Sequence, residues 1–225
     1  MPNHTTRHAT AAADQIDPGR DCPLCPRLVT YRIENRGKEP DWHNAPVPSF
    51  GALDAELLIV GLAPGVRGAN RTGRPFTGDY AGVLLYHTLI KFGFATGSYL
   101  ERPDDGLTLR NCRVTNAVRC VPPQNRPTPA EDKACNPFLV AEIAAMPRLR
   151  AILTLGTVAH LMSLRALGAR AAAHKFTHGA QHEAGSVLLF NSYHVSRYNT
   201  STRRLTPQMF ENVVAEIREF IKLDH

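Results

Sequence analysis

The chain alternates apolar runs of strand length with segments whose apolar residues recur at helical spacing. Four runs are predicted to be strands, namely residues 53–60, 112–118, 151–155 and 186–193. Four segments are predicted to be helices, namely residues 80–92, 128–146, 157–167 and the segment that begins at residue 206. Strands and helices that alternate in this way form a parallel sheet with helices on both faces. The sequence therefore predicts an α/β fold.

Two of the predicted helices carry clear start signals. Residues 128–131, Thr-Pro-Ala-Glu, supply a threonine N-cap, a proline at the first helical position and a glutamate at the third. Residues 206–207 repeat the Thr-Pro pair. Pro137 falls inside the first of these helices, and we expect it to kink or interrupt that helix.

Three of the predicted strands are followed directly by segments that carry glycine or polar chemistry. A glycine-rich loop occupies residues 61–65, Asn116 ends the second strand and His194 ends the fourth. Right-handed crossovers place the carboxyl ends of parallel strands at one edge of the sheet, where open α/β sheets bind ligands. These segments are therefore expected to converge. Taken singly, each has an ordinary alternative: a glycine turn, an asparagine that closes a turn and a structural histidine.

The loop after the first strand continues through residues 73–79, Gly-Arg-Pro-Phe-Thr-Gly-Asp. Phe76 is an aromatic side chain beside arginines and could stack on a base, although filling a gap in the core is as common. Asp79 precedes a predicted helix and is equally well interpreted as its N-cap. The residues alone leave both alternatives open.

Four of the five cysteines form one pattern. Cys22 and Cys25 are a C-x-x-C pair, and Cys120 and Cys135 flank a proline-rich stretch. Because the cysteine count is odd and the N-terminus lacks an apolar signal segment, a metal ion or cluster is a better interpretation than disulfides. Cys112 begins a predicted strand and is assigned to the core instead.

Positive charge gathers in two loops of a chain whose net charge is +6. One loop follows the first predicted strand and one follows the last, and their arginines are Arg67, Arg71, Arg74, Arg197, Arg203 and Arg204. The charge is compatible with a polyanionic partner, while solvated loop arginines are the plain alternative. A group of histidines spaced four apart, His174, His178 and His182, is assigned a structural or surface role because a glycine interrupts it.

Length and composition indicate a single globular domain. The 225 residues are 43% hydrophobic, and no apolar run reaches the roughly 18 residues that span a bilayer. We expect residues 1–20 to be a flexible N-terminal arm and residues 21–225 to be one domain. A monomeric, cytoplasmic protein that does not contact membranes is the expectation.

Taken together and in order, the four motifs and the cysteines resemble the uracil-DNA glycosylase superfamily. The motifs are Gly-Leu-Ala-Pro-Gly at 61–65, Gly-Arg-Pro-Phe-Thr-Gly-Asp at 73–79, Thr-Asn-Ala-Val-Arg-Cys at 115–120 and Tyr-His-Val-Ser-Arg at 193–197. They look most like its type-b, or family five, iron–sulfur branch. The resemblance covers about residues 20 to 222. It implies a three-layer α/β/α sandwich with a central four-stranded parallel sheet, and excision of uracil and related deaminated or damaged bases from DNA.

The resemblance also implies roles for residues of the motifs. Phe76 would stack on the flipped base, Asn116 would read its edge and His194 would lie by its carbonyl, with Gly61 and Ala63 lining the same pocket. Cys22, Cys25, Cys120 and Cys135 would hold a [4Fe–4S] cluster. Ala63 stands where better-known members have an acidic or polar residue, so Asp79 is taken as the substitute carboxylate. Val195 replaces a proline that many members have.

The function that follows is a monofunctional DNA glycosylase, which leaves an abasic site for base excision repair. Such an enzyme must flip its target base out of the duplex at a cost of a few kcal/mol. The residues expected to hold DNA are Arg67, Arg71, Arg197, Arg203 and Arg204, with Tyr198 as the wedge that fills the gap. Since no lysine lies in a motif, a Schiff base and lyase activity are not expected. Two alternatives are a non-catalytic nucleic-acid-binding module with a four-cysteine zinc site, and a cluster-bearing redox protein.

Overall fold

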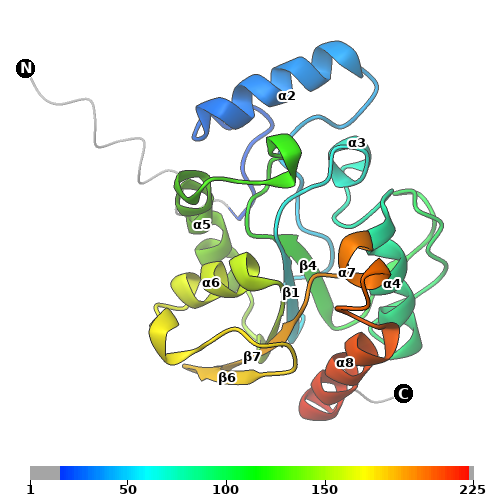
Figure 1. Ribbon diagram of the computed structural model, residues 1–225, viewed down its shortest axis with the longest axis vertical. Coiled ribbons are helices and arrows are strands. Elements are labelled where there is room, and N and C mark those ends of the chain that lie inside the picture. Colours follow the sequence, from blue (N-terminus) through cyan, green and yellow to red (C-terminus); the bar gives the residue numbers. More distant parts are fainter. Residues whose placement is uncertain (1–15, 223–225) are drawn as a thin grey trace, which may run out of the picture.

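The computed structural model describes residues 16–222, whose helices lie on both sides of a central sheet (Figure 1). Most of the expected N-terminal arm, residues 1–15, lies outside the described residues. Asp17, within that arm, is described, and its carboxylate accepts a hydrogen bond from Arg119 at 2.7 Å. Between residues 16 and 222, no helix has the length and apolar character needed to cross a membrane.

A five-stranded sheet forms the middle layer, in the order β4-β1-β5-β7-β6. Its strands are β1 (Leu57–Gly61), β4 (Cys112–Asn116), β5 (Ala151–Leu155), β6 (Gln181–Ala184) and β7 (Val187–Ser192). β4, β1, β5 and β7 are parallel, which confirms the predicted parallel sheet of four strands. β1, β4 and β5 are buried along their whole length, as expected for parallel strands covered on both faces.

The fifth strand, β6, runs antiparallel to β7 at one edge and was not expected from the sequence. Its four residues, Gln-His-Glu-Ala, contain no apolar run, because an edge strand that faces solvent needs few buried side chains. Two further short strands, β2 (Ala95–Thr96) and β3 (Thr108–Leu109), pair with each other outside the main sheet.

Helices cover both faces of the sheet. They are α2 (Pro26–Lys38), α3 (Ala69–Thr72), α4 (Tyr80–Lys91), α5 (Pro129–Ala144), α6 (Thr157–Ala166), α7 (Arg197–Ser201) and α8 (Pro207–Ile221). Neighbouring residues of β1 serve the two faces: Ile59 packs with α4 and α8, and Leu58 packs with α5 and α6. The three-layer α/β/α architecture is therefore confirmed.

The start signal of α5 is confirmed, while an interruption at its proline, one of the two expected effects, is not. The Thr128 hydroxyl accepts from the Glu131 N–H at 3.3 Å, and the Glu131 carboxylate accepts from the Thr128 N–H at 2.8 Å. The helix continues through Pro137, so an interruption there is wrong. Pro137 and Lys133 are both exposed, so solvent can bond the carbonyl that the proline leaves free.

A buried ion network ties α5 to β4 and to the N-terminal segment. The fully buried carboxylate of Glu142 accepts from Arg113 and from Arg119, each at 2.6 Å. Arg119 also donates to Asp17 and to Ser49. Buried charges of this kind are retained only when they are paired. The network therefore fixes β4, which ends at Asn116, and the segment that follows it, which carries Cys120.

Candidate active site and cysteine pocket

A pocket lies at the carboxyl edge of the sheet, where the expected motifs converge. It encloses about 260 Å³, counting its open mouth. Its lining comes from the loop after β1, the start of α4, the end of β4 and the segment after β7, and comprises Ala63, Pro64, Gly65, Ala69, Phe76, Asp79, Ala81, Asn116 and His194. Of the residues predicted for base binding, Ala63, Phe76, Asn116 and His194 share this lining.

Gly61 does not line the pocket but determines how close two lining residues lie. A Cβ at Gly61 would collide with the Phe76 ring and with the Asn116 side-chain oxygen. The missing side chain therefore lets the ring and the amide close on the end of β1. The Phe76 ring centre lies 6.0 Å from the His194 ring centre, with the two planes inclined at 30°.

The backbone at Phe76 is unusual and is held from behind. Its φ is +53°, a left-handed value that non-glycine residues rarely adopt. The Tyr99 hydroxyl donates to the Phe76 carbonyl at 3.0 Å, and the Tyr86 hydroxyl donates to the Pro75 carbonyl at 2.6 Å. Strained residues fixed by their surroundings are concentrated at functional sites. The two tyrosines thus position the ring over the pocket, and their contacts could not be read from the motif.

The Asn116 side chain is buried but unpaired. It is 4% exposed, and the hydrogen bonds found among residues 16–222 do not include its side-chain amide. The backbone on either side is fixed, because Asn116 pairs with Gly61 and the Ala117 N–H donates to the Gly61 carbonyl at 2.9 Å. The amide lines the pocket and is not one of the fully buried unpaired groups of the described residues, so it is open to a ligand that enters the pocket.

Asp79 is the N-cap of α4, as one interpretation of the sequence expected. Its carboxylate accepts from the Ala81 N–H at 3.1 Å. The same carboxylate also packs against the glycine-rich loop, since a Cβ at Gly65 would lie 2.9 Å from its Oδ2 and one at Gly68 still closer. Burial raises the pKa of Asp79 above its usual range. The carboxylate therefore caps the helix and faces the pocket at once.

His194 is neutral at physiological pH. Burial lowers the pKa of its imidazole to about 4 because a charged ring would lose its hydration. Its backbone carbonyl accepts from the Asn199 side chain at 2.8 Å, which fixes the turn before α7. Within residues 16–222, no hydrogen bond reaches its ring nitrogens, so a neutral N–H can be offered to a ligand.

A wider cavity opens outside this pocket and shares Ala63, Gly65, Asp79, Ala81 and His194 with it. It encloses about 950 Å³, counting its mouth, and adds Leu62, Tyr80, Asn125, Ser196 and Arg197 to the lining. The Arg197 guanidinium lies over the Tyr80 ring, 5.1 Å from its centre. Tyr80 and Asn125 were not selected from the sequence. Tyr80 directly follows the motif at 73–79, and Asn125 lies in the proline-rich stretch, so neither belongs to a motif.

The predicted DNA-binding residues all lie on the surface, whereas Arg74, a further arginine of the first loop, does not. The side chains of Arg67, Arg71, Arg197, Arg203 and Arg204 are exposed, and Tyr198 is 71% exposed at the start of α7. Arg74 differs: it is buried, and it donates to both carboxylate oxygens of Asp105 at 2.8 Å. For Arg74 the solvated-loop interpretation is wrong, because its guanidinium is buried against Asp105. This partner lies 31 residues further along the chain, so the loop sequence alone could not reveal it.

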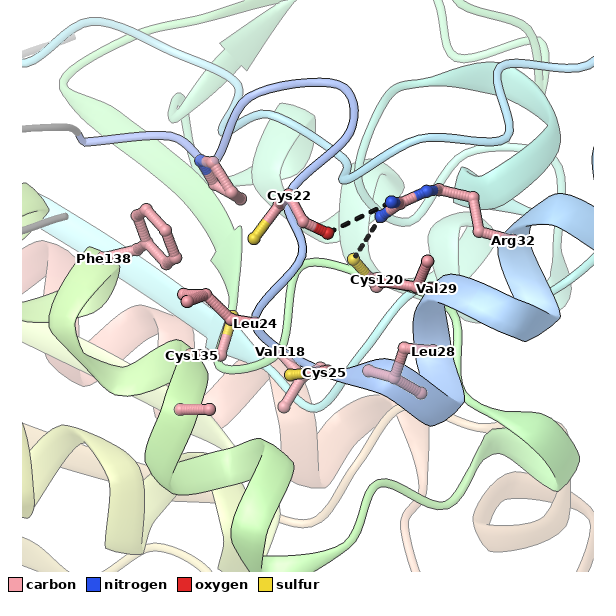
Figure 2. Close-up of a pocket in the computed structure, with 12 residues that line it drawn as sticks. Cys22, Leu24, Cys25, Leu28, Val29, Arg32, Val118, Cys120, Cys135 and Phe138 are labelled. Carbon is pink, nitrogen blue, oxygen red and sulfur yellow. Dashed lines mark hydrogen bonds between the residues drawn. The ribbon is translucent and has the colours of Figure 1, made fainter. Parts of the chain in front are cut away.

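The four selected cysteines line a second pocket, between α2, the segment after β4 and α5 (Figure 2). It encloses about 310 Å³, counting its mouth, and its other lining side chains are mostly apolar. Cys112 is 1% exposed in the main core, and its thiol donates to the Phe94 carbonyl. Its exclusion from the cysteine group is therefore confirmed.

The chemistry of this pocket suits a soft, positively charged group. No disulfide forms among residues 16–222, and burial raises the pKa of Cys25 and of Cys120 to about 12. Thiols become thiolates in such surroundings when a metal supplies positive charge. In this part of the chain, no group of three or more histidine, cysteine or acidic side chains is arranged around a single metal ion. Four thiols around one pocket nevertheless fit a cluster that accepts four thiolates.

The histidines spaced four apart have structural partners. His174 bonds the carbonyls of Arg170 and Glu183, and His182 bonds that of Lys175. The His178 ring accepts from the Tyr193 N–H. These contacts agree with the structural role expected for them.

Comparisons with known proteins identify the family. The model of the uracil DNA glycosylase superfamily matches residues 48–218. A type-5 uracil-DNA glycosylase of Thermus thermophilus is 44% identical over 90% of this chain and 94% of its own length. A type-5 uracil-DNA glycosylase of Pyrobaculum aerophilum is 40% identical over 86% of each chain, and a type-4 enzyme of the same organism is 33% identical over 68% of this chain and 64% of its own. The chain belongs to the uracil DNA glycosylase superfamily, which confirms the resemblance seen in its motifs.

Proposed function

We propose that the chain is a monofunctional glycosylase that hydrolyses the N-glycosidic bond of uracil and related deaminated bases in DNA. One observation carries the proposal: a pocket at the sheet edge holds an aromatic ring, an unpaired amide and a neutral imidazole beside a carboxylate. Family membership and the type-5 relatives support the same activity. A non-catalytic binding module would need neither Asp79 nor His194 in this pocket.

Base recognition falls to Phe76 and Asn116. The Phe76 ring supplies a flat apolar face on which a flipped base can stack. The Asn116 amide offers one donor group and one acceptor, which suits the edge of uracil that carries a carbonyl beside an N–H. Ala63 leaves room for the base because its side chain is small, and Gly61 lets Phe76 and Asn116 come close to the end of β1.

Bond cleavage falls to His194 and Asp79. As the bond to the sugar breaks, negative charge collects on the base and positive charge on the sugar. The neutral His194 N–H donates to the base carbonyl, and a preorganised donor of this kind contributes about 3–4 kcal/mol. Asp79 orients the attacking water or balances the sugar cation. Water adds to the sugar carbon, and the released base takes up a proton.

DNA would be held by exposed arginines, with Tyr198 as the wedge; the arginines are Arg67, Arg71, Arg197, Arg203 and Arg204. Arg67 and Arg71 follow the glycine-rich loop in sequence, and Arg197 lines the wider cavity. Phosphate contacts of this kind make affinity fall steeply with salt. We further propose that residues 21–225 act as one catalytic domain and as a monomer in the cytoplasm.

Cys22, Cys25, Cys120 and Cys135 would hold a [4Fe–4S] cluster, the group that the family resemblance implies. When bound, the cluster supplies a covalent link between the N-terminal segment and α5, and a centre that exchanges one electron. The Ala117 and Val118 N–H groups donate to the carbonyls of Gly61 and Leu62. The segment that would carry the cluster ligand Cys120 is thereby joined to the loop at the base pocket.

The activity is tested on a duplex oligonucleotide that contains one uracil. The purified protein should create a site that breaks only after alkali treatment, since hydrolysis leaves an intact abasic strand. The same duplex with thymine in place of uracil is the control. Strand breaks before alkali would contradict the monofunctional mechanism, and no break after alkali would contradict the glycosylase.

Asp79→Asn separates the two roles of this residue. Asparagine is also a good helix cap, so we expect the fold and melting temperature to remain those of the wild type. We expect single-turnover excision to slow by tenfold or more, about 1.4 kcal/mol or more in the barrier. A rate within about threefold of the wild type, under about 1 kcal/mol, would leave Asp79 as a helix cap and move the chemistry to His194.

The low pKa of His194 predicts an unusual titration. With the folded pKa at about 4 and an ordinary value of 6.5 in the unfolded chain, the imidazole stays neutral in the folded protein at pH 6. Its contribution to stability is complete above pH 6.5 and is lost as the pH falls toward 4, because only the unfolded chain takes up the proton there. NMR of the His194 ring should show no titration step near neutral pH. A midpoint close to the ordinary value would contradict a buried, neutral ring.

A further inference from the structure

One guanidinium in the cysteine pocket forms no ion pair within residues 16–222. Arg32 is 3% exposed and lines the pocket from α2. Its Nη1 donates to the Cys120 sulfur at 3.7 Å and its Nη2 to the Cys22 carbonyl at 3.1 Å (Figure 2). Its Nε is buried and has no hydrogen-bond partner in residues 16–222.

Asp21 feels the charge of Arg32 but is paired with another arginine. None of the ion pairs found in residues 16–222 includes Arg32. Asp21 is close in sequence, but its carboxylate binds Arg36 at 2.6 Å. A buried cation without a partner costs several kcal/mol. The guanidinium lies in a pocket whose other polar groups are mainly thiols. An occupant with net negative charge would offset the cost of burying it.

We propose that Arg32 is the counter-cation of the cluster held by Cys22, Cys25, Cys120 and Cys135, and that it raises the reduction potential of that cluster. The inference rests on the cluster proposed above. Four thiolates give a [4Fe–4S] group a net negative charge, and reduction adds one electron to it without forming or breaking a bond. A buried cation stabilises the more negative state more strongly, and a hydrogen bond to a ligating sulfur acts in the same direction.

Two features separate this arrangement from ordinary packing. The donor reaches Cys120 from α2, although Cys120 lies 88 residues away in sequence, so the contact is tertiary. The same guanidinium also donates to the carbonyl of Cys22, so it bridges two of the cysteines that line the pocket.

The test is a redox titration of the intact protein, followed by visible absorbance and by EPR, with iron and sulfide measured for each sample. Arg32→Met removes the charge and keeps the length of the side chain. Lys38→Met removes the same charge from the exposed end of α2 and is the matched control. We expect Arg32→Met to shift the reduction equilibrium toward the oxidised state by about tenfold or more, or 59 mV for one electron, and Lys38→Met to leave it unchanged.

If Arg32→Met does not retain iron, two more variants separate the effect of the charge from that of the hydrogen bond. Arg32→Gln is neutral but still donates a hydrogen bond, and Arg32→Lys keeps the charge. Loss of iron from the neutral variants alone supports the counter-cation. Equal potentials in the wild type and in every loaded Arg32 variant would overturn it. Loss of iron from Arg32→Lys together with the neutral variants would also overturn the proposal, because the shape of Arg32 and not its charge would then be what the cluster needs.

The outcomes also separate this inference from the proposed function. A wild-type protein that excises uracil but contains zinc and no visible absorbance leaves the glycosylase intact and overturns the redox role of Arg32. A protein that shows the cluster and the expected shift in potential but excises no uracil supports the role of Arg32 and overturns the glycosylase.

Discussion

Asn116→Ala is expected to slow single-turnover excision of uracil by about 5-fold to 150-fold. The reason is that a base whose polar edge is buried without partners loses about 1–3 kcal/mol, which converts to that range of rates. The Asn116 side chain has no other partner in the described part of the chain, so its removal should leave the melting temperature nearly unchanged. Excision rates under single turnover, with enzyme in excess over a uracil duplex, measure the effect.

Asn212→Ala provides the matched control, because Asn212 is exposed on α8, away from the residues that line the two cavities. Affinity for a duplex without uracil should be similar in both variants, since Asn116 is assigned to the flipped base. Excision by Asn116→Ala at the wild-type rate would mean that the amide only closes the turn after β4.

Cys120→Ala is expected to remove the proposed cluster and with it much of the stability. One lost ligand leaves three thiols around a pocket that also holds the charge of Arg32, and metal binding by such sites is coupled to folding. Iron and sulfide should fall toward zero, and the visible absorbance should disappear. The melting temperature should drop by about ten degrees, the shift that roughly 3–5 kcal/mol give in a domain of this size.

Cys112→Ala is the control for that experiment. Cys112 is a buried cysteine of the same chain, but it lies in the main core and not in the pocket. It should retain the full iron content and lose only the small packing term of one sulfur atom. A colourless Cys120→Ala protein with wild-type stability and activity would contradict a structural cluster.

The strands that carry the site were predictable because they are buried on both faces. Leu57 to Val60 form a continuous apolar run, and a parallel sheet then brings the strand ends Gly61 and Asn116 together. β6 escaped prediction for the opposite reason, since a solvent-facing edge strand carries polar residues. α2 also lacks a clear apolar stripe, because two of its three buried residues are Arg32 and Asn35.

The electrostatic details could not be predicted, because they depend on partners distant in sequence. Arg74 becomes a buried structural residue only through Asp105, and Arg32 becomes a pocket residue only through Cys120. Tyr80 and Asn125 reach the mouth of the cavity from unrelated segments. A motif gives the residue type at a position, whereas its burial and charge depend on how the remaining chain packs.

The central claim is that the pocket at the sheet edge binds and releases uracil, and the release of free base tests it most directly. The assay follows labelled uracil liberated from a duplex by the wild-type protein, next to the double variant Asn116→Ala/His194→Ala. We expect the wild type to release uracil stoichiometrically with abasic sites and the double variant to release it at least about a hundredfold more slowly, a barrier change of about 2.7 kcal/mol or more. Wild-type protein that releases no uracil, or a folded double variant that releases it as fast, would contradict the account.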